Sequence, residues 1–409
     1  MVAGLRDLLS TWRSLRRNAW LLLLASSSVS VPIGFISVSL PIYLKRLGFD
    51  EILAGTFFTV SGITSVALVI PLGILADRYG RRRIVLLGCC TFVLAVALLV
   101  LAESYIAFVA AAATLGLAEA LMYSTFDALL ADATTPAQRT AAFGFTFFLS
   151  TLAFAAGNLV ATLPDAAYLR DPLNVPGAYR PPLTDMVVVA ALAPILISAV
   201  RLPAVRVLRG KSLLPRKSAP ILTKFFASNF VMGMGAGLII PLFSLWFLLK
   251  FSLGEGVTGP LIAVANVVVG VAYLAAPLLE RRYGMVRSIV SLQFLATGVL
   301  FLIPFTWNLY AVGTLYVVRN LLMNVSWPMA SSFLMSTVDE SERSAASAVV
   351  GASFQLPFAM STAVGGYLLT VHVDLPFFVT TALYLTGITT FWFFFRNLRK
   401  PRATAGRSL

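Results

Sequence analysis

The amino-acid sequence predicts an all-α polytopic membrane protein with 12 transmembrane helices in two pseudo-symmetric six-helix halves. Three observations predict this fold class: an apolar composition, a succession of long apolar segments, and a repeat halfway along the chain. Of the 409 residues, 59% are hydrophobic and only 12% are charged. This is more apolar surface than one water-soluble core can bury, so a soluble globular protein is excluded.

Twelve segments reach or approach the roughly 20 apolar residues that a bilayer-spanning helix needs. They cover residues 19–44, 52–76, 84–102, 105–130, 141–163, 186–200, 222–249, 257–279, 286–304, 309–335, 345–370 and 375–395. The sixth is short and contains Pro194. The first follows four arginines, as a signal peptide would, but its apolar character continues to Leu44. That is too long for the apolar core of a signal peptide and predicts a membrane span.

The distribution of positive charge predicts the orientation. If both termini are cytoplasmic, the tails and even-numbered loops carry 25 of the 31 lysines and arginines, and the outer loops carry 5. Cytoplasmic loops of membrane proteins are enriched in these residues. We therefore expect a multi-pass protein of the cell (inner or plasma) membrane with both termini cytoplasmic. The formal charge of +14 then reflects contact with anionic lipid, and no nucleic-acid partner is needed.

The chain contains an internal repeat with an offset of about half its length. The sequence DRYGRRR at 77–83 is echoed by RRYGMVR at 281–287, and Arg139 corresponds to Arg343. Parallel six-helix repeats are found in secondary transporters. We expect an N-terminal half at 1–200, a C-terminal half at 221–409, and a basic cytoplasmic linker at 201–220 that contains three prolines.

The segment GILADRYGRRR at 73–83 resembles the signature between the second and third helices of the major facilitator superfamily. The matching residues include Gly73, Asp77, Arg78, Gly80, Arg81 and Arg82. With the two halves and the basic linker, the resemblance spans essentially the whole chain. A less specific match, LLADATTPAQRTAAFG at 129–144, is similar to the helix 4–5 connection of drug-efflux-type members, to which the motifs are closest in style.

The resemblance implies that the signature residues act as a cytoplasmic latch between the halves. Asp77, Arg78 and Arg81 would form this latch in the outward-open state, with Asp132 as a partner and Arg139 nearby. Gly73 would permit close helix approach, and Gly80 suits a tight turn. The alternative is that the arginines, Arg82 among them, only anchor helix ends in the lipid headgroups.

Two departures weaken the comparison with proton-coupled drug antiporters. Their fifth helix carries G-x-x-x-G-P-x-x-G-G, whereas this chain has LAFAAGNLVATLP, in which Gly157 is the remaining glycine. Their fourth helix often carries an arginine four residues before a glycine, and here Ala112 precedes Gly116. Transport is therefore a stronger inference than antiport.

Charged residues inside a bilayer are costly, so each is a candidate functional residue. Predicted helix 4 carries Glu119, Tyr123 and Asp127 at spacings of four, on roughly one helix face. Predicted helix 10 carries Arg319, Asn320 and Asn324, with Trp327 one turn below. In the family, helices 1, 4, 7 and 10 line the central cavity. The resemblance thus implies that Arg319 binds an anionic substrate group and Glu119 takes up a coupling proton. The alternative is a permanent ion pair or two separately satisfied charges.

These observations predict a secondary active transporter that moves a small organic solute by alternating access, by proton-coupled efflux. The alternative within transport is uptake or uniport of an organic anion. A membrane-embedded enzyme and a non-transporting receptor are less well supported, because neither a catalytic cluster nor an added soluble domain is recognisable. No metal or cofactor is expected, and the nucleotide-binding G-x-x-x-x-G-K-[ST] motif is missing. The expected partners are the solute, protons and membrane lipid, with the protein as a monomer.

Overall fold

The computed structural model describes residues 16–123, 125–201, 217–272, 285–339 and 342–396. These ranges are almost entirely helical and contain no β-strand. Nine helical segments within them are long and apolar enough to cross a bilayer. The predicted fold class is therefore confirmed.

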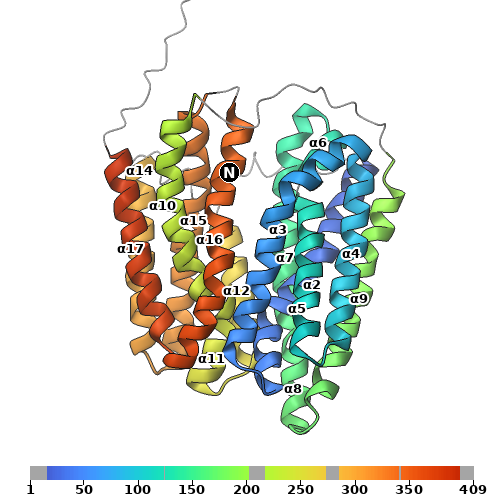
Figure 1. Ribbon diagram of the computed structural model, residues 1–409, viewed down its shortest axis with the longest axis vertical. Coiled ribbons are helices and arrows are strands. Elements are labelled where there is room, and N and C mark those ends of the chain that lie inside the picture. The colour runs from blue at the N-terminus through green and yellow to red at the C-terminus, as the bar shows by residue number, and fades with distance from the viewer. Residues whose placement is uncertain (1–15, 124, 202–216, 273–284, 340–341, 397–409) are drawn as a thin grey trace, which may run out of the picture.

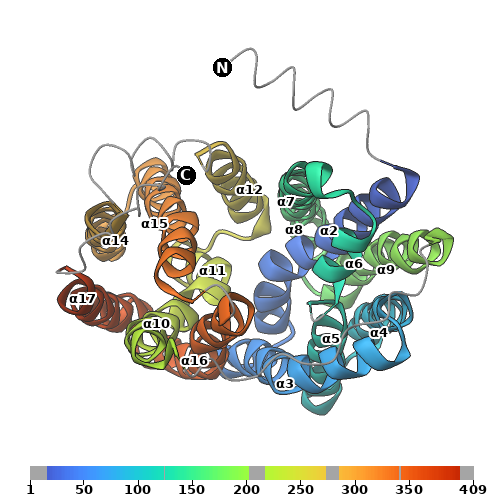
Figure 2. The same cartoon turned by 90° about the horizontal axis from the view of Figure 1, so that it is seen from above.

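The helices form two bundles that lie side by side (Figures 1 and 2). The first bundle contains α2 (Arg17–Arg46), α3 (Glu51–Tyr79), α4 (Arg81–Leu101), α5 (Tyr105–Tyr123), α6 (Phe126–Asp132), α7 (Pro136–Val160), α8 (Thr162–Arg170) and α9 (Val175–Ala199). The second contains α10 (Ala219–Ile239), η1 (Ile240–Leu242), α11 (Phe243–Phe251), α12 (Glu255–Ala272), α14 (Met285–Leu302), η3 (Ile303–Phe305), α15 (Leu309–Thr337), α16 (Arg343–Val371) and α17 (Leu375–Phe395).

Each of the twelve predicted segments overlaps one of these helices or a consecutive pair. The largest difference is the sixth segment, because α9 begins at Val175 and continues through three prolines. The predicted seventh span is divided by η1, which contains Pro241. Proline has no amide hydrogen to continue the α-helical bonding. Residues 273–279 of the eighth segment and 202–216 of the predicted linker lie outside the described residues.

The two ends of the molecule differ in which connections they carry. We call the end where α2 begins and α17 finishes the terminal end, at the top of Figure 1. The opposite end, here called the far end, carries residues 47–50, 102–104, 171–174, 252–254, 306–308 and 372–374 between helices. Since all spans run between these two ends, the position of a residue along its helix gives its depth.

The two bundles pack against each other through α3 with α16 and through α12 with α7 and α8 (Figure 2). On α3, the Thr59 hydroxyl donates to the Ala359 carbonyl at 2.6 Å and accepts from the Ala363 amide at 2.9 Å. A Cβ on Gly55 would lie 2.4 Å from the Thr362 carbonyl oxygen, so the backbones approach closely there. These α3 residues belong to the part of the helix nearest the far end. The bundles are therefore in close contact on that side.

Candidate transport cavity and gates

A cavity of about 1120 Å³ lies between the bundles and extends from mid-molecule toward the terminal end. The first bundle contributes residues from the early part of α7, between Gly144 and Leu152. The second contributes residues from α10, α12, α14, α15, α16 and α17. The α15 residues, from Arg319 to Leu334, lie in the part of that helix nearer the terminal end. The cavity is thus formed mainly by the second bundle.

Arg319 is the charged residue among the described residues that line this cavity. It is 4% exposed, and its Nη2 donates to the Tyr384 hydroxyl at 3.0 Å. Its Nη1 donates to Asn320 Oδ1 at 3.1 Å, while its Nε has no hydrogen-bond partner. None of these partners is negatively charged. Arg319 therefore brings an uncompensated positive charge to the cavity, with hydrogen-bonding capacity left over.

The rest of the lining combines amides with aromatic rings. The amide side chains are those of Asn229, Gln293, Asn320, Asn324 and Gln355. The half-exposed Trp327 ring stands edge-on to Phe354, with the ring centroids 5.1 Å apart. Amides hydrogen-bond neutral polar groups, whereas aromatic faces contact apolar ones. The cavity is suited to a solute that is partly apolar and carries several hydrogen-bonding groups.

The predicted helix 4 residues are not among the described residues that line this cavity. Glu119 is partly buried on α5, whose main packing partners are α3 and α4 within the first bundle. Tyr123 at the end of α5 and Asp127 on α6 are exposed. Of the four helices that the family resemblance places around the cavity, α10 and α15 supply lining residues here, while α2 and α5 do not. The expected meeting of Glu119 with Arg319 is not seen, because α5 is surrounded by its own bundle.

The signature residues form contacts within the first bundle, at the terminal end. Arg81 Nη1 lies 2.8 Å from Asp132 Oδ2, so the expected partner of this arginine is present. Arg82 donates to the Ile197 carbonyl at 3.2 Å and to the Ser198 carbonyl, at the end of α9. Arg139 donates to the Ala131 carbonyl at 3.4 Å. The last carbonyls of a helix lack partners within it, and these arginines supply donors.

The remaining signature residues shape the turn. Gly80 connects α3 to α4 with a φ of 98°, a conformation that glycine adopts without strain. Gly73 is partly exposed on α3, and Arg78 is exposed. The side chain of Asp77 lies outside the described residues. The contacts of the signature at this end therefore stabilise one bundle from within.

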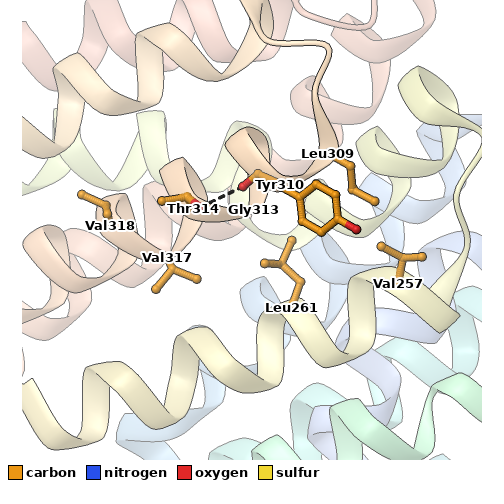
Figure 3. Close-up of a pocket in the computed structure, with 8 residues that line it drawn as sticks. All are labelled: Val257, Leu261, Leu309, Tyr310, Gly313, Thr314, Val317 and Val318. Carbon is orange, nitrogen blue, oxygen red and sulfur yellow. Dashed lines mark hydrogen bonds between the residues drawn. The ribbon is translucent and has the colours of Figure 1, made fainter.

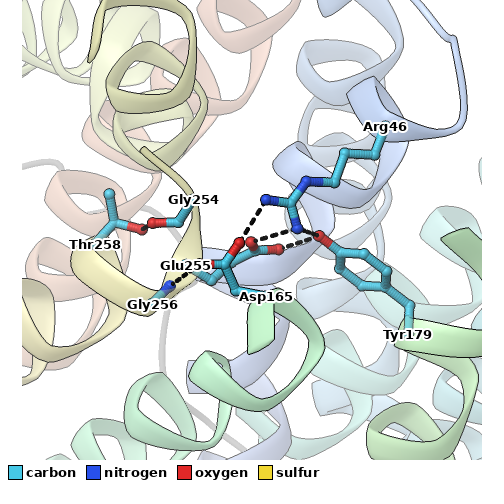
Figure 4. Close-up of polar contacts among 7 residues, drawn as sticks. All are labelled: Arg46, Asp165, Tyr179, Gly254, Glu255, Gly256 and Thr258. Atoms are coloured by element: carbon cyan, nitrogen blue, oxygen red, sulfur yellow. Dashed lines mark hydrogen bonds and ion pairs between the residues drawn. The ribbon is translucent and has the colours of Figure 1, made fainter. Parts of the chain in front are cut away.

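A buried polar cluster joins the two bundles at the far end, and sequence reasoning missed it (Figure 4). We define the far-end cluster as Arg46, Asp165, Tyr179 and Glu255. Arg46 Nη2 lies 2.5 Å from Asp165 Oδ1, and Arg46 Nη1 lies 3.1 Å from Glu255 Oε2. Arg46 Nη1 also donates to the Tyr179 hydroxyl at 2.8 Å, and this hydroxyl donates to Glu255 Oε1. Glu255 belongs to the second bundle and the other three residues to the first.

The sequence offered only a weak signal for this cluster. Arg46, Asp165 and Glu255 each lie just outside a predicted span, where charged residues are ordinary. The usable signal was their common position: all three lie at the same predicted end of the molecule. Sequence alone gives no measure of which of the charges at that end meet in space.

A second cavity, of about 440 Å³, lies between α12 and α15 near the far end (Figure 3). It is lined mainly by aliphatic residues, among them Val257, Leu261 and Val317. The Thr314 hydroxyl donates to the Tyr310 carbonyl at 2.8 Å. No charged residue among those described lines this cavity to orient a polar solute. The larger cavity is the better candidate for a substrate site.

The sequence matches the Major Facilitator Superfamily over residues 22–336 and 225–409. The chain belongs to this superfamily. No curated protein is similar enough in sequence to count as a closer relative.

Solved transporter structures share the fold at low sequence identity. A mutant form of the nucleoside transporter NupG is 14% identical with a TM-score of 0.77, covering 92% of this chain and 100% of its own. A bacterial homologue of the human lysosomal transporter Spinster, inward-facing and occupied, is 12% identical with a TM-score of 0.77, covering 93% and 96%. The human organic anion transporter MFSD10 (TETRAN) is 15% identical with a TM-score of 0.62, covering 92% and 99%. The chain is therefore a multi-pass membrane transporter of small molecules and not an enzyme.

Proposed function

We propose that this transporter carries a small amphipathic organic anion by alternating access, with Arg319 holding the negative charge. The observation that carries the proposal is the position of Arg319: it is buried, lines the large cavity and has no acidic partner. A buried charge without a counter-ion is costly, so its retention favours a ligand that supplies the counter-ion.

The cavity also supports the size and polarity of this substrate. Its volume of about 1120 Å³ is at the upper end for small-molecule sites, which usually span roughly 300–1,000 Å³. The amides would bind neutral polar groups, and Trp327 with Phe354 would contact an apolar part. The similar fold of a human organic anion transporter agrees with this substrate class, but it is the unpaired guanidinium that carries the argument.

Several parts of the transport cycle follow as proposals. With the termini in the cytoplasm, as the basic loops predict, the cavity reaches toward the cytoplasmic side and the far end is the closed outer side. We retain proton-coupled efflux across the cell membrane by a monomer as the mode of transport, with Glu119 as a coupling carboxylate. The Arg81–Asp132 pair would belong to the cytoplasmic latch when the terminal end closes, as the two halves, 1–200 and 221–409, rock about the linker at 201–220.

A ligand screen with an arginine variant tests the proposed function. Purified protein is screened by thermal shift against carboxylates, sulfonates, nucleosides, neutral sugars and organic cations, because a ligand that binds the folded state raises its stability. We expect the best ligand to be an anion. Arg319→Ala should weaken its binding by about 2 kcal/mol, roughly 30-fold, through loss of charge-assisted hydrogen bonds.

Arg180→Ala is the matched control, because Arg180 lies outside the cavity and pairs with the exposed Glu103. It should leave the affinity unchanged. Arg319→Lys should recover part of the affinity, since it restores the charge without the guanidinium fork. A best ligand that is cationic, and that Arg319→Ala binds more tightly, would exclude Arg319 as an anion site.

A further inference from the structure

The far-end cluster contains more negative than positive charge. Its two carboxyl groups, from Asp165 and Glu255, share the single guanidinium of Arg46 (Figure 4). All three are removed from water: Glu255 is 0% exposed, and the side chains of Arg46 and Asp165 are 7% and 10% exposed. Two ionised carboxylates against one arginine would leave a net charge of −1 in a buried site. Such a charge is strongly disfavoured in a low-dielectric environment.

The other hydrogen bonds in the cluster do not supply the missing positive charge. Glu255 Oε1 accepts from the neutral Tyr179 hydroxyl, and Asp165 Oδ2 accepts from the Gly256 amide at 2.9 Å. Glu255 Oε2 makes no hydrogen bond, although Arg46 Nη1 is 3.1 Å away. One carboxyl oxygen therefore has free capacity within the cluster, which is where a proton would be accommodated.

The neighbouring cations are already paired elsewhere. Lys45 lies 2.7 Å from Glu51, and Arg180 pairs with Glu103. On the α11 side, Lys250 lies 2.9 Å from Asp374. The adjacent rings bring no compensating charge: Tyr168 lies under the Arg46 guanidinium at 3.9 Å, and Tyr43 stacks on Tyr179 at 4.4 Å. The excess negative charge therefore belongs to the far-end cluster itself.

We propose that the far-end cluster is a proton-binding gate, closed only when Asp165 and Glu255 share one proton. The assignment of residues to bundles explains how opening would release it. When the bundles separate at this end, Arg46 and Asp165 remain together on the first bundle as a neutral one-to-one pair. Glu255 leaves with the second bundle, reaches water and can ionise. Closing the far end thus takes up one proton, and opening it releases one. This inference rests on the proposed function only in treating the opening as a transport step.

A cysteine buried between the bundles can report the opening. Thr362 is 0% exposed, its hydroxyl bonds its own helix at Phe358, and it lies against α3 at Gly55, away from the cluster. Thr362→Cys would be introduced after Cys89 and Cys90 are replaced by alanine. Its labelling by a membrane-impermeant maleimide is measured in proteoliposomes without substrate, from about pH 5.5 to 8.5. One linked proton predicts a labelling rate that rises by up to about tenfold per pH unit.

Glu255→Gln decides the proposal. This change leaves Arg46 and Asp165 balanced, so the gate should stay closed, with slow labelling that no longer depends on pH. Asp165→Asn has the same charge logic from the first bundle and replaces it if Glu255→Gln does not fold. Glu103→Gln, at the same end but exposed, should keep the full pH dependence.

Two results would overturn the proton-binding gate: labelling of the parent protein that does not change with pH, or an unchanged pH slope in both carboxamide variants. Ligand binding at Arg319 is measured separately by thermal shift. The gate can therefore fail while anion binding stands, and anion binding can fail while the gate stands.

Discussion

The far end and the terminal end are both rich in charged residues, but they use them differently. At the far end, Arg46, Asp165, Tyr179 and Glu255 cross from one bundle to the other and are buried. At the terminal end, Arg81 and Asp132 pair within the first bundle, with side chains 23% and 20% exposed. Glu342 likewise accepts hydrogen bonds from the Lys217 and Ser218 amides within the second bundle. The described polar contacts thus hold the bundles together at one end only, and the cavity lies toward the other.

This difference teaches where the free energy of the closed gate resides. Removing one partner from a buried charge cluster costs about 3–5 kcal/mol, whereas an exposed ion pair contributes about 0–1 kcal/mol. The far end should therefore resist separation much more strongly than the terminal end in this conformation. Mutations at the two ends ought to differ accordingly.

The largest expected effect is that of Arg46→Ala. It leaves two buried carboxylates without a cation, so closure of the far end should be destabilised by about 3–5 kcal/mol at neutral pH, more than about 100-fold in the opening equilibrium. The measurement is the labelling rate of Thr362→Cys. The effect should shrink at about pH 5.5, where the carboxyls can both take up protons. The control Arg180→Ala, at the same end, should change labelling only a few-fold, and equal effects of the two would contradict the comparison.

Glu119→Gln separates the proposed coupling carboxylate from the gate. It mimics a protonated side chain, so it should keep substrate binding and exchange without a gradient. Accumulation driven by a pH gradient, about tenfold per unit for one coupled proton, should be lost. Transport into proteoliposomes at matched and opposed pH measures this. Labelling of Thr362→Cys should keep its pH dependence. Full accumulation by the variant would exclude Glu119 and make Asp127 the next carboxylate to test.

Asp132→Asn tests the terminal end. The Arg81–Asp132 pair is partly exposed and joins no bundles in this conformation, so thermal stability should fall by at most about 1 kcal/mol. If the pair supports the latch in the opposite state, the transport rate should fall about fivefold while ligand affinity is retained. Unchanged transport would leave the arginines as anchors of helix ends. Glu103→Gln, an exposed pair at the far end, serves as the matched control.

The smallest expected effect is that of acid on the start of α10. Partial desolvation raises the pKa of Glu342, but hydrogen bonds from Lys217 and Ser218 outweigh it, so the pKa lies below its ordinary value. A carboxyl with a lowered folded-state pKa adds stability above its unfolded pKa and loses it as pH falls through the folded pKa. Limited proteolysis near residue 217 should therefore accelerate below about pH 4. Glu342→Gln should be cleaved faster at neutral pH and lose this acid response; an unchanged profile would contradict the role.

Much of the fold could be predicted because its causes are local. Runs of apolar residues predict spans, and Gly80 predicts the turn between α3 and α4 that its φ of 98° now shows. The extent of α9 was underestimated because Arg180, Thr184 and Asp185 interrupt its apolar run, although they lie in the same helix. Helix continuity there depends on packing against α2 and α4, which composition does not report.

The sequence by itself determined that this protein is a multi-pass helical transporter of the superfamily, since hydropathy, charge bias and a long signature are readable along the chain. It also pointed to Arg319, because a lone charge in an apolar helix is conspicuous wherever that helix packs. Only the tertiary structure decided which charges meet. Arg46 and Asp165 are 119 positions apart, and Tyr179 and Glu255 are 76 apart in different bundles. Coulomb attraction and desolvation act over a few ångströms, and such proximity is set by how the bundles pack, not by position in the sequence.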